Sequence, residues 1–257
     1  MNPDIPLKIS EEVDAIRKSC QIASRILHAV AAHVEKGIST LELDRIASAL
    51  MRQYDALPGV TVGFPGSICI SVNEVAAHGV PSRQKLREGD IITIDVAVLW
   101  GGWFGDSAAS FGVGVLSAEK QRLIAAAKQA LAAAVQAARR GSRMGDVGAA
   151  VLAVAEEHRC VVLPEFVGHG IGRKLHEEPV VPHTGTRGQG LPIVAGMVFT
   201  LEPALGLGGV KVRKESDGWS LRSMDRSPVA QFEHTVAVFA NRTEVLTQPE
   251  VASEGEE

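Results

Sequence analysis

The chain has 257 residues, of which 46% are hydrophobic and 22% charged, with a net charge of −4 and a pI near 6.1. This composition predicts a globular protein and excludes a nucleic-acid-binding surface that depends on overall positive charge. No run approaches 18 uncharged apolar residues and no apolar leader precedes the first charged segment, so we expect no membrane span. The three cysteines lack CxxC spacing, and we therefore expect a reducing, cytoplasmic location.

In chain order, the predicted elements begin with two helices. The first starts at Ser10 and continues to Gly37, an expected stop residue. The second opens at Ser39, which forms a capping-box pattern with Glu42. Strands are expected in two segments rich in Ile and Val, 67–72 and 91–99.

The second half of the chain repeats the order of two helices and then strands. An Ala-rich helix is predicted from Ser117 to Arg140, and another from Met144 to His158. Further strands are expected over residues 160–163, 197–201 and 232–239. The tail, 250–257, is acidic and is expected to be disordered.

The two halves also share short motifs. "GDIITID" (89–95) aligns without a gap with "GMVFTLE" (196–202), and a His-Gly pair precedes each, at 78–79 and at 169–170. We therefore expect one domain over residues 1–257, built from two related halves at about 10–115 and 117–248. Asp95 and Glu202 would then occupy equivalent points of the two halves.

Asp95 interrupts a β-branched run, where a buried charge costs several kcal/mol unless it is paired or binds a metal. The Gly101-Gly102 pair predicts a hairpin turn that sets residue 95 opposite residue 108, so Asp106 lies on the same face one diagonal step away. Carboxylates this close repel each other, and neither strand offers a Lys or Arg. A divalent cation between them would remove the repulsion.

Three more candidate ligands follow in the second half. Glu202 and Glu233 each interrupt an apolar, strand-like run, and His169 lies among glycines. Any one of them could instead be part of a salt bridge at a strand end, but four acids and one histidine together favour a metal centre. The set is too large for one zinc and suits two metals about 3.5–4 Å apart. Its oxygen-rich composition favours Mn, Fe or Co.

Five motifs, in their order and spacing, resemble those of type I methionine aminopeptidases: "VNEVAAHGVP", "IDVAVLWGGWFGD", "GHGIGRKLHEEP", "TLEPAL" and "FEHTV". The resemblance covers about residues 8–248. It implies an α+β pita-bread fold, in which a pseudo-twofold pair of half-domains forms a curved, mainly antiparallel sheet covered by helices. It also implies that residues 1–257 form a single catalytic domain.

The resemblance further implies the roles of the site residues. Two divalent metal ions (Co, Mn, Fe or Zn) would be held by Asp95, Asp106, His169, Glu202 and Glu233, with Asp106 and Glu233 bridging. Glu202 would carry the water proton, and His78 and His176 would be the catalytic histidines that contact the peptide. The remaining histidines receive no chemical role: His28, His33, His158, His183 and His234.

The implied reaction removes the initiator methionine from nascent polypeptides when the second residue is small, by attack of a metal-bridged hydroxide on the first peptide bond. The expected partners are the N-termini of nascent chains and, as a further candidate, the ribosome. We expect a monomer that binds no specific nucleic acid and no membrane.

The methionine pocket is where the chain departs from the family pattern. Phe64, Cys69 and Trp219 match pocket positions, although packing in an ordinary core is the alternative for the two aromatics. Leu175 stands where relatives commonly have an aromatic residue, and Thr61 where a tyrosine is frequent. Both departures affect the shape of the pocket and leave the chemistry of the metal ligands unchanged.

Three alternative functions are consistent with parts of this pattern. Xaa-Pro aminopeptidases and prolidases resemble the same ligand set but usually have a large domain before the catalytic half, whereas only 77 residues precede His78 here. Type II methionine aminopeptidases have an inserted helical subdomain, for which the short segments between His176, Glu202 and Glu233 leave no room. A nonenzymatic binding module of this fold would have lost ligands, and all five are present.

Overall fold

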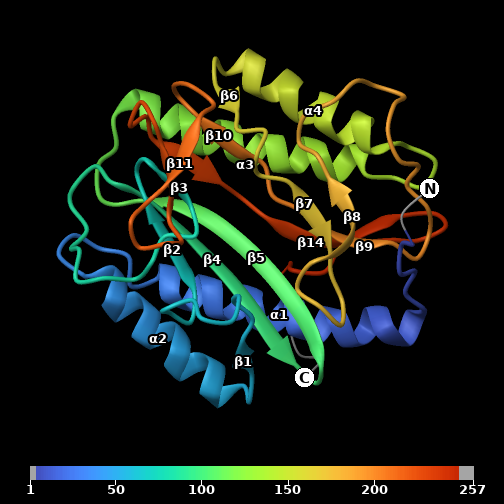
Figure 1. Ribbon diagram of the computed structural model, residues 1–257, viewed down its shortest axis with the longest axis horizontal. Coiled ribbons are helices and arrows are strands. Elements are labelled where there is room, and N and C mark those ends of the chain that lie inside the picture. The colour runs from blue at the N-terminus through green and yellow to red at the C-terminus, as the bar shows by residue number, and fades with distance from the viewer. Residues whose placement is uncertain (1–3, 249–257) are drawn as a thin grey trace, which may run out of the picture.

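The computed structural model describes residues 4–248 (Figure 1). Its helices are α1 (Ser10–Ala31), α2 (Thr40–Gln53), α3 (Ala118–Ala137) and α4 (Met144–Glu157). The strands of the first half are β1 (Leu57–Pro58), β2 (Cys69–Val72), β3 (Val75–Ala77), β4 (Ile91–Trp100) and β5 (Trp103–Gly112). Those of the second half are β6 (Val161–Val162), β7 (Gly168–Gly170), β8 (Glu177–Val181), β9 (Val198–Leu201), β10 (Ala204–Gly206), β11 (Val212–Lys214), β12 (Leu221–Ser223), β13 (Val229–Gln231), β14 (His234–Val238) and β15 (Thr243–Val245).

The first helix ends earlier than its sequence predicts. We expected it to reach Gly37, but α1 ends at Ala31. The N–H groups of His33 and Val34 bond to carbonyls three residues back, which tightens the last turn, and the Gly37 N–H bonds to Leu86 O. These bonds turn the chain away from the helix axis before the glycine is reached.

The second helix begins as its sequence predicts. Ser39 Oγ accepts a hydrogen bond from Glu42 N, and Glu42 Oε2 accepts one from Ser39 N. This reciprocal pair satisfies two of the backbone donors that a helix start leaves without partners.

We expect Ser39→Ala to lower the free energy of unfolding by about 1 kcal/mol, because the cap of α2 is lost. Urea unfolding of the variant measures this loss. Ser48→Ala, in the interior of the same helix, is the matched control and should be neutral or slightly stabilising. Equal stabilities of the two variants would contradict the capping role of Ser39.

The strand pairs between described residues are all antiparallel, and the hairpin of β4 and β5 has the predicted register. Gly101 and Gly102 form its turn with φ of 58° and 78°, values that favour glycine. Asp95 pairs with Ala108, and Asp106 pairs with Ala97. The two aspartates therefore share one face at the predicted diagonal distance.

In the second half of the chain, the backbone passes from one sheet to another at two points, which we call crossings. Strands β9 and β14 pair in a five-stranded sheet, whereas their continuations β10 and β13 pair in a three-stranded sheet. The predicted strand 232–239 is observed as β14 but begins two residues later, at His234. The residues before it form the separate strand β13, and between the two strands the Glu233 N–H bonds to Ala108 O of β5. Glu202 marks the matching crossing, where Pro203 offers no N–H to continue the ladder.

The helices pack in two pairs. Apolar side chains of α1 and α2 bury Ile70 of β2 and Ile94 of β4, and those of α3 and α4 bury Phe199 of β9 and Val236 of β14. In Figure 1 the two helix pairs lie along opposite sides of the molecule, with the strands between them. Within residues 4–248, no helix has the length and apolar character needed to cross a membrane. The predicted disordered tail, 250–257, lies outside the described residues.

Candidate metal centre

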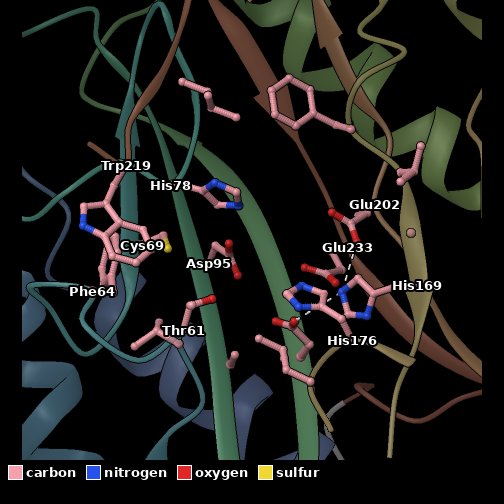
Figure 2. Close-up of a pocket in the computed structure, with 18 of the residues that line it drawn as sticks. Thr61, Phe64, Cys69, His78, Asp95, His169, His176, Glu202, Trp219 and Glu233 are labelled. Carbon is pink, nitrogen blue, oxygen red and sulfur yellow. Dashed lines mark ion pairs between the residues drawn. The ribbon is translucent and has the colours of Figure 1, made fainter. Parts of the chain in front are cut away.

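All five predicted metal ligands face one cavity of about 350 Å³. Figure 2 shows His169, His176, Glu202 and Glu233 at one side of it, and Phe64, Cys69 and Trp219 at the other, with His78 and Asp95 between the two groups. The cavity thus joins a polar, ligand-rich end to an apolar end. The predicted site residues that line it are Phe64, Cys69, His78, Asp95, Asp106, His169, Leu175, His176, Glu202, Trp219 and Glu233.

The ligand atoms lie within reach of a common ion. Asp106, His169 and Glu233 each offer one atom, and these atoms lie within 4.8 Å of one another. His169 Nε2 is also 3.5 Å from Glu202 Oε1 and 4.0 Å from Asp106 Oδ2. The side chain of Asp95 interacts directly with that of Asp106. Residues from three strands and from two connections between strands therefore converge on one point.

Two buried oxygens in this cluster have no protein partner. Among the described residues, Asp106 Oδ1 and Glu233 Oε1 are buried without a hydrogen bond. A buried polar atom without a partner costs about 1–3 kcal/mol, and more when it carries charge. Carboxylate oxygens and an imidazole nitrogen are the donors that divalent transition ions accept. The orphan oxygens and the donor set both fit a bound cation.

The pKa shifts of the carboxylates also indicate that this site needs a cation or protons to neutralise it. Burial raises the pKa of Asp95, Glu202 and Glu233 well above ordinary values, and the charge of Asp106 raises each of them further. Burial also raises the pKa of Asp106 to about 6. Four carboxylates in one buried site are stable together when protons or a cation neutralise them.

The surrounding hydrogen bonds orient His169 and Glu202. His169 Nδ1 lies 3.1 Å from Gly170 O, so this nitrogen carries the proton and the Nε2 lone pair points to the carboxylates. Thr200 Oγ1 accepts from His169 N and donates to Glu202 Oε1 at 2.8 Å. Gln231 Nε2 donates to Glu202 Oε2 at 3.3 Å. The threonine thus holds a ligand from β7 and one at the end of β9 in a fixed relation.

The glycines on either side of His169 allow β7 to pack closely between β8 and β9. A Cβ added to Gly168 would lie 2.2 Å from Thr200 O, and one added to Gly170 would lie 2.1 Å from Glu178 O. Strand β7 pairs with β8 and β9 at these points. A side chain at either position would push the strands apart, so the alternating glycines place His169 deep in the sheet.

His78 and His176 are open to the cavity and do not belong to the group of close ligand atoms. The His176 ring packs edge-on against His169, with ring centroids 4.3 Å apart. Partial burial lowers the pKa of both His78 and His176, which favours neutral rings at pH 7. Both rings are therefore available to hydrogen-bond a molecule in the cavity.

The apolar end of the cavity contains three of the predicted pocket residues, Phe64, Cys69 and Trp219, whereas Leu175, which also lines the cavity, packs against the core formed with α1. Phe64 and Trp219 meet edge to face with ring centroids 5.4 Å apart, and the exposed Thr61 lies on the same wall. Asp217 Oδ1 accepts from the N–H of Trp219 at 2.8 Å and holds the turn that carries the indole. Both aromatics are half-buried and line an open cavity, so they do not form part of a closed core.

Several residues near the cavity were not recognised in the sequence. Val60, Phe166 and Val180 line it, and His183 lies behind it with hydrogen bonds to Phe166 and Glu202. Phe166 stands three residues before His169, and this short spacing is the one sequence signal that could have identified it. His183 lies outside the recognised motifs, so the sequence predicts no role for it.

Comparison with known proteins identifies the family. Residues 14–240 match the model of metallopeptidase family M24. A methionine aminopeptidase of Treponema pallidum is 38% identical over 247 residues, which cover 95% of this chain and 97% of the relative. The crystal structure of the methionine aminopeptidase of Rickettsia prowazekii superimposes with a TM-score of 0.92 at 34% identity, and the match covers 95% of this chain and 100% of that one.

A more distant structure shares only the fold. The prolidase of Pyrococcus furiosus has a TM-score of 0.74 at 22% identity, and the match covers 95% of this chain but 66% of the prolidase. The methionine aminopeptidases are instead matched end to end. The pita-bread fold predicted from the sequence is therefore confirmed, and the chain belongs to metallopeptidase family M24 and, within it, to the methionine aminopeptidases.

Proposed function

We propose that this protein removes N-terminal methionine from polypeptides whose second residue is small. One observation supports this proposal: a single cavity is lined by all five predicted ligand side chains, of which Asp106, His169 and Glu233 could hold one metal ion, and by an apolar, aromatic wall at its other end. The polar end supports hydrolysis of a peptide bond, and the apolar end supports binding of one methionine-sized side chain.

Asp95, Asp106, His169, Glu202 and Glu233 would hold two divalent ions, with Asp106 and Glu233 shared between them. The unpartnered oxygens of Asp106 and Glu233 support this sharing, because each is buried and lacks a protein donor. When bound, divalent ions lower the pKa of the attacking water and polarise the scissile carbonyl. The candidates are Co, Mn, Fe and Zn.

Glu202 would take the proton of the attacking water and pass it to the leaving nitrogen. Its position supports this role, because the Glu202 side chain lines the cavity and Oε1 lies 3.5 Å from His169 Nε2, next to the proposed ions. His78 and His176 would donate hydrogen bonds to the peptide and to the developing oxyanion. Their neutral rings each have one N–H for this purpose.

The pocket formed by Phe64, Cys69, Leu175 and Trp219 would accept the methionine side chain. An unbranched, flexible thioether fits an irregular apolar slot and contacts aromatic rings favourably. Branched side chains of similar size lose about 1–3 kcal/mol for each poorly placed methylene, so we expect strong preference for methionine over leucine or valine.

We also infer the setting in which the enzyme acts. Its substrates would be the N-termini of nascent polypeptides in the cytoplasm, and residues 1–257 would form one catalytic domain that works as a monomer. Docking on the ribosome is a further proposal that co-sedimentation of the purified protein with ribosomes would test.

The substrate test uses a Met-Ala-Ser peptide with the purified protein after chelation and after addition of each candidate ion in turn. We expect methionine release with added ion and none in excess chelator. Ala-Pro and Met-Lys-Ser peptides are the controls, and both should be left intact. Release of alanine from Ala-Pro, without release of methionine, would replace the proposal with a proline-directed aminopeptidase.

We expect His176→Ala to lower kcat for Met-Ala-Ser by about 100-fold or more while metal binding is retained. The variant lacks one donor to the oxyanion, and such a donor is typically worth 10²–10³ in kcat. Steady-state kinetics and the metal content after dialysis measure the two effects separately. Loss of metal equal to the loss of activity would instead make His176 a ligand.

A further inference from the structure

A completely buried imidazole bridges two walls of the cavity. His183 is 1% exposed and follows β8 by two residues. Its Nδ1 lies 3.0 Å from Phe166 O, and its Nε2 lies 3.0 Å from Glu202 N. One ring therefore connects the backbone of a metal-ligand residue with the backbone of a residue in the cavity wall.

These two partners determine the state of the ring. A backbone N–H can only donate, so Nε2 must offer its lone pair to Glu202 N. A backbone carbonyl can only accept, so Nδ1 must carry the proton that bonds to Phe166 O. Hence His183 is neutral and is the Nδ1–H tautomer.

The Glu202 backbone depends on this bond because the regular ladder ends just before it. The last pair between β9 and β14 is Leu201 with His234, and Pro203 offers no N–H after it. Without His183, the Glu202 N–H would point into protein at the crossing between two sheets. The side chain of Glu202 is held separately, by Thr200 at one oxygen and Gln231 at the other.

The other end of the bridge leads to a second ligand. Phe166 is 8% exposed, lines the cavity and stands two residues before β7, which carries His169. The bond from His183 thus fixes the entry of β7 relative to the end of β9. The imidazole determines the spacing between the segments that present His169 and Glu202.

We propose that His183 is a positioning residue that acts through Glu202, by fixing the backbone at the sheet crossing so that the carboxylate meets the metal centre correctly. The ring itself is buried and is not part of the cavity lining. The activity readout below rests on the proposed methionine release, whereas the spectroscopic readouts do not.

The first test determines which ring nitrogen of His183 carries the proton in the metal-free wild-type protein. Long-range ¹H–¹⁵N spectra distinguish a protonated from an unprotonated ring nitrogen, and the His183 signals are identified by their loss in a His183→Phe variant or, if that variant does not fold, by selective labelling. We expect a protonated Nδ1 and an unprotonated Nε2. The opposite tautomer, or a doubly protonated ring at pH 7, would overturn the proposal.

The second test compares His183→Phe, which keeps a flat ring and loses both bonds, with His183→Gln, whose amide has one donor group and one acceptor. Loss of an outer partner of a metal ligand typically costs about 10–100-fold in activity or metal affinity. We expect a fall of this size in kcat for the Phe variant, a changed absorption spectrum of its Co(II) form, and a smaller loss for the Gln variant. Wild-type kcat and spectrum in folded His183→Phe would overturn the proposal, as would equal losses in both variants.

Leu43→Ala is the control for simple loss of stability. Leu43 is fully buried in α2, remote from the cavity lining, so its truncation should lower the melting temperature while kcat and the Co(II) spectrum stay at wild-type values. A kcat loss in Leu43→Ala equal to that in His183→Phe would show that stability alone explains both, against the proposal. If wild-type protein released no methionine, the proposed function would fail while the ring and Co(II) spectra still tested His183.

Discussion

Glu202→Gln is expected to keep the fold and most of the bound metal while kcat for methionine release falls by about 10²–10⁴-fold. Glutamine preserves the shape of the side chain and an oxygen that can accept from Thr200 Oγ1. Its amide cannot take the proton of the attacking water or return one to the leaving nitrogen. The measurements are kcat at saturating ion and peptide, the metal content, and the melting temperature.

Glu74→Gln is the matched control for this substitution. Glu74 lies outside the cavity lining and forms a half-buried ion pair with Arg222, which also pairs with Glu215. We expect its kcat to stay within about twofold of wild type, since the removed charge contacts no ligand. Near wild-type kcat in Glu202→Gln would remove Glu202 from the role of proton carrier and leave it as a ligand alone.

The parts of the site that depend on local sequence were predictable. The Gly101-Gly102 turn fixes a two-residue hairpin, and the period of a β-strand then places Asp95 and Asp106 on one face without any knowledge of the rest of the chain. The capping box of Ser39 and Glu42 is equally local. Such features follow from contacts between residues close in sequence, for which the sequence pattern is sufficient.

The parts that depend on distant contacts were not predictable. Glu233 ends one strand and begins another because its N–H pairs with Ala108 O, which is 125 residues away in the chain. The strand-like sequence on both sides of Glu233 gives no sign that the chain changes sheets there. His183 is a similar case, because its two partners come from β9 and the segment before β7. A histidine outside a motif looks the same in the sequence whether it is buried between two walls or exposed.

These crossings also explain why the ligands can converge. A carboxylate in the middle of a regular strand points at right angles to its sheet, as Asp95 and Asp106 do. Glu202 and Glu233 instead stand where β9 passes to β10 and β13 passes to β14, between a five-stranded and a three-stranded sheet. The break in each ladder brings both glutamates toward the aspartate hairpin. The metal centre is therefore a product of the sheet topology.

If Asp106 bridges two ions as proposed, Asp106→Asn should weaken the binding of both ions together. In wild-type protein an ion at 100 times its Kd raises the free energy of unfolding by about 2.7 kcal/mol, and the variant should lose most of this gain. Calorimetric titration of Mn or Co into the metal-free proteins measures the affinities. Loss of one ion with unchanged affinity for the other would contradict the bridge.

In the metal-free state the same substitution should have the opposite effect on stability. Burial raises the pKa of Asp106 from 3.8 to about 6, so between these pH values the folded protein binds more protons than the unfolded chain. Wild-type stability should therefore fall as pH rises through this window, whereas the Asn variant lacks the contribution of Asp106 and keeps only those of Asp95, Glu202 and Glu233. Urea unfolding in chelator from pH 4 to pH 7.5 should show the stability of the variant, relative to that of wild type, increasing as pH rises. A stability difference that does not change with pH would mean that the Asp106 carboxylate is not strained by burial, and the need for a cation at this point would lose its electrostatic basis.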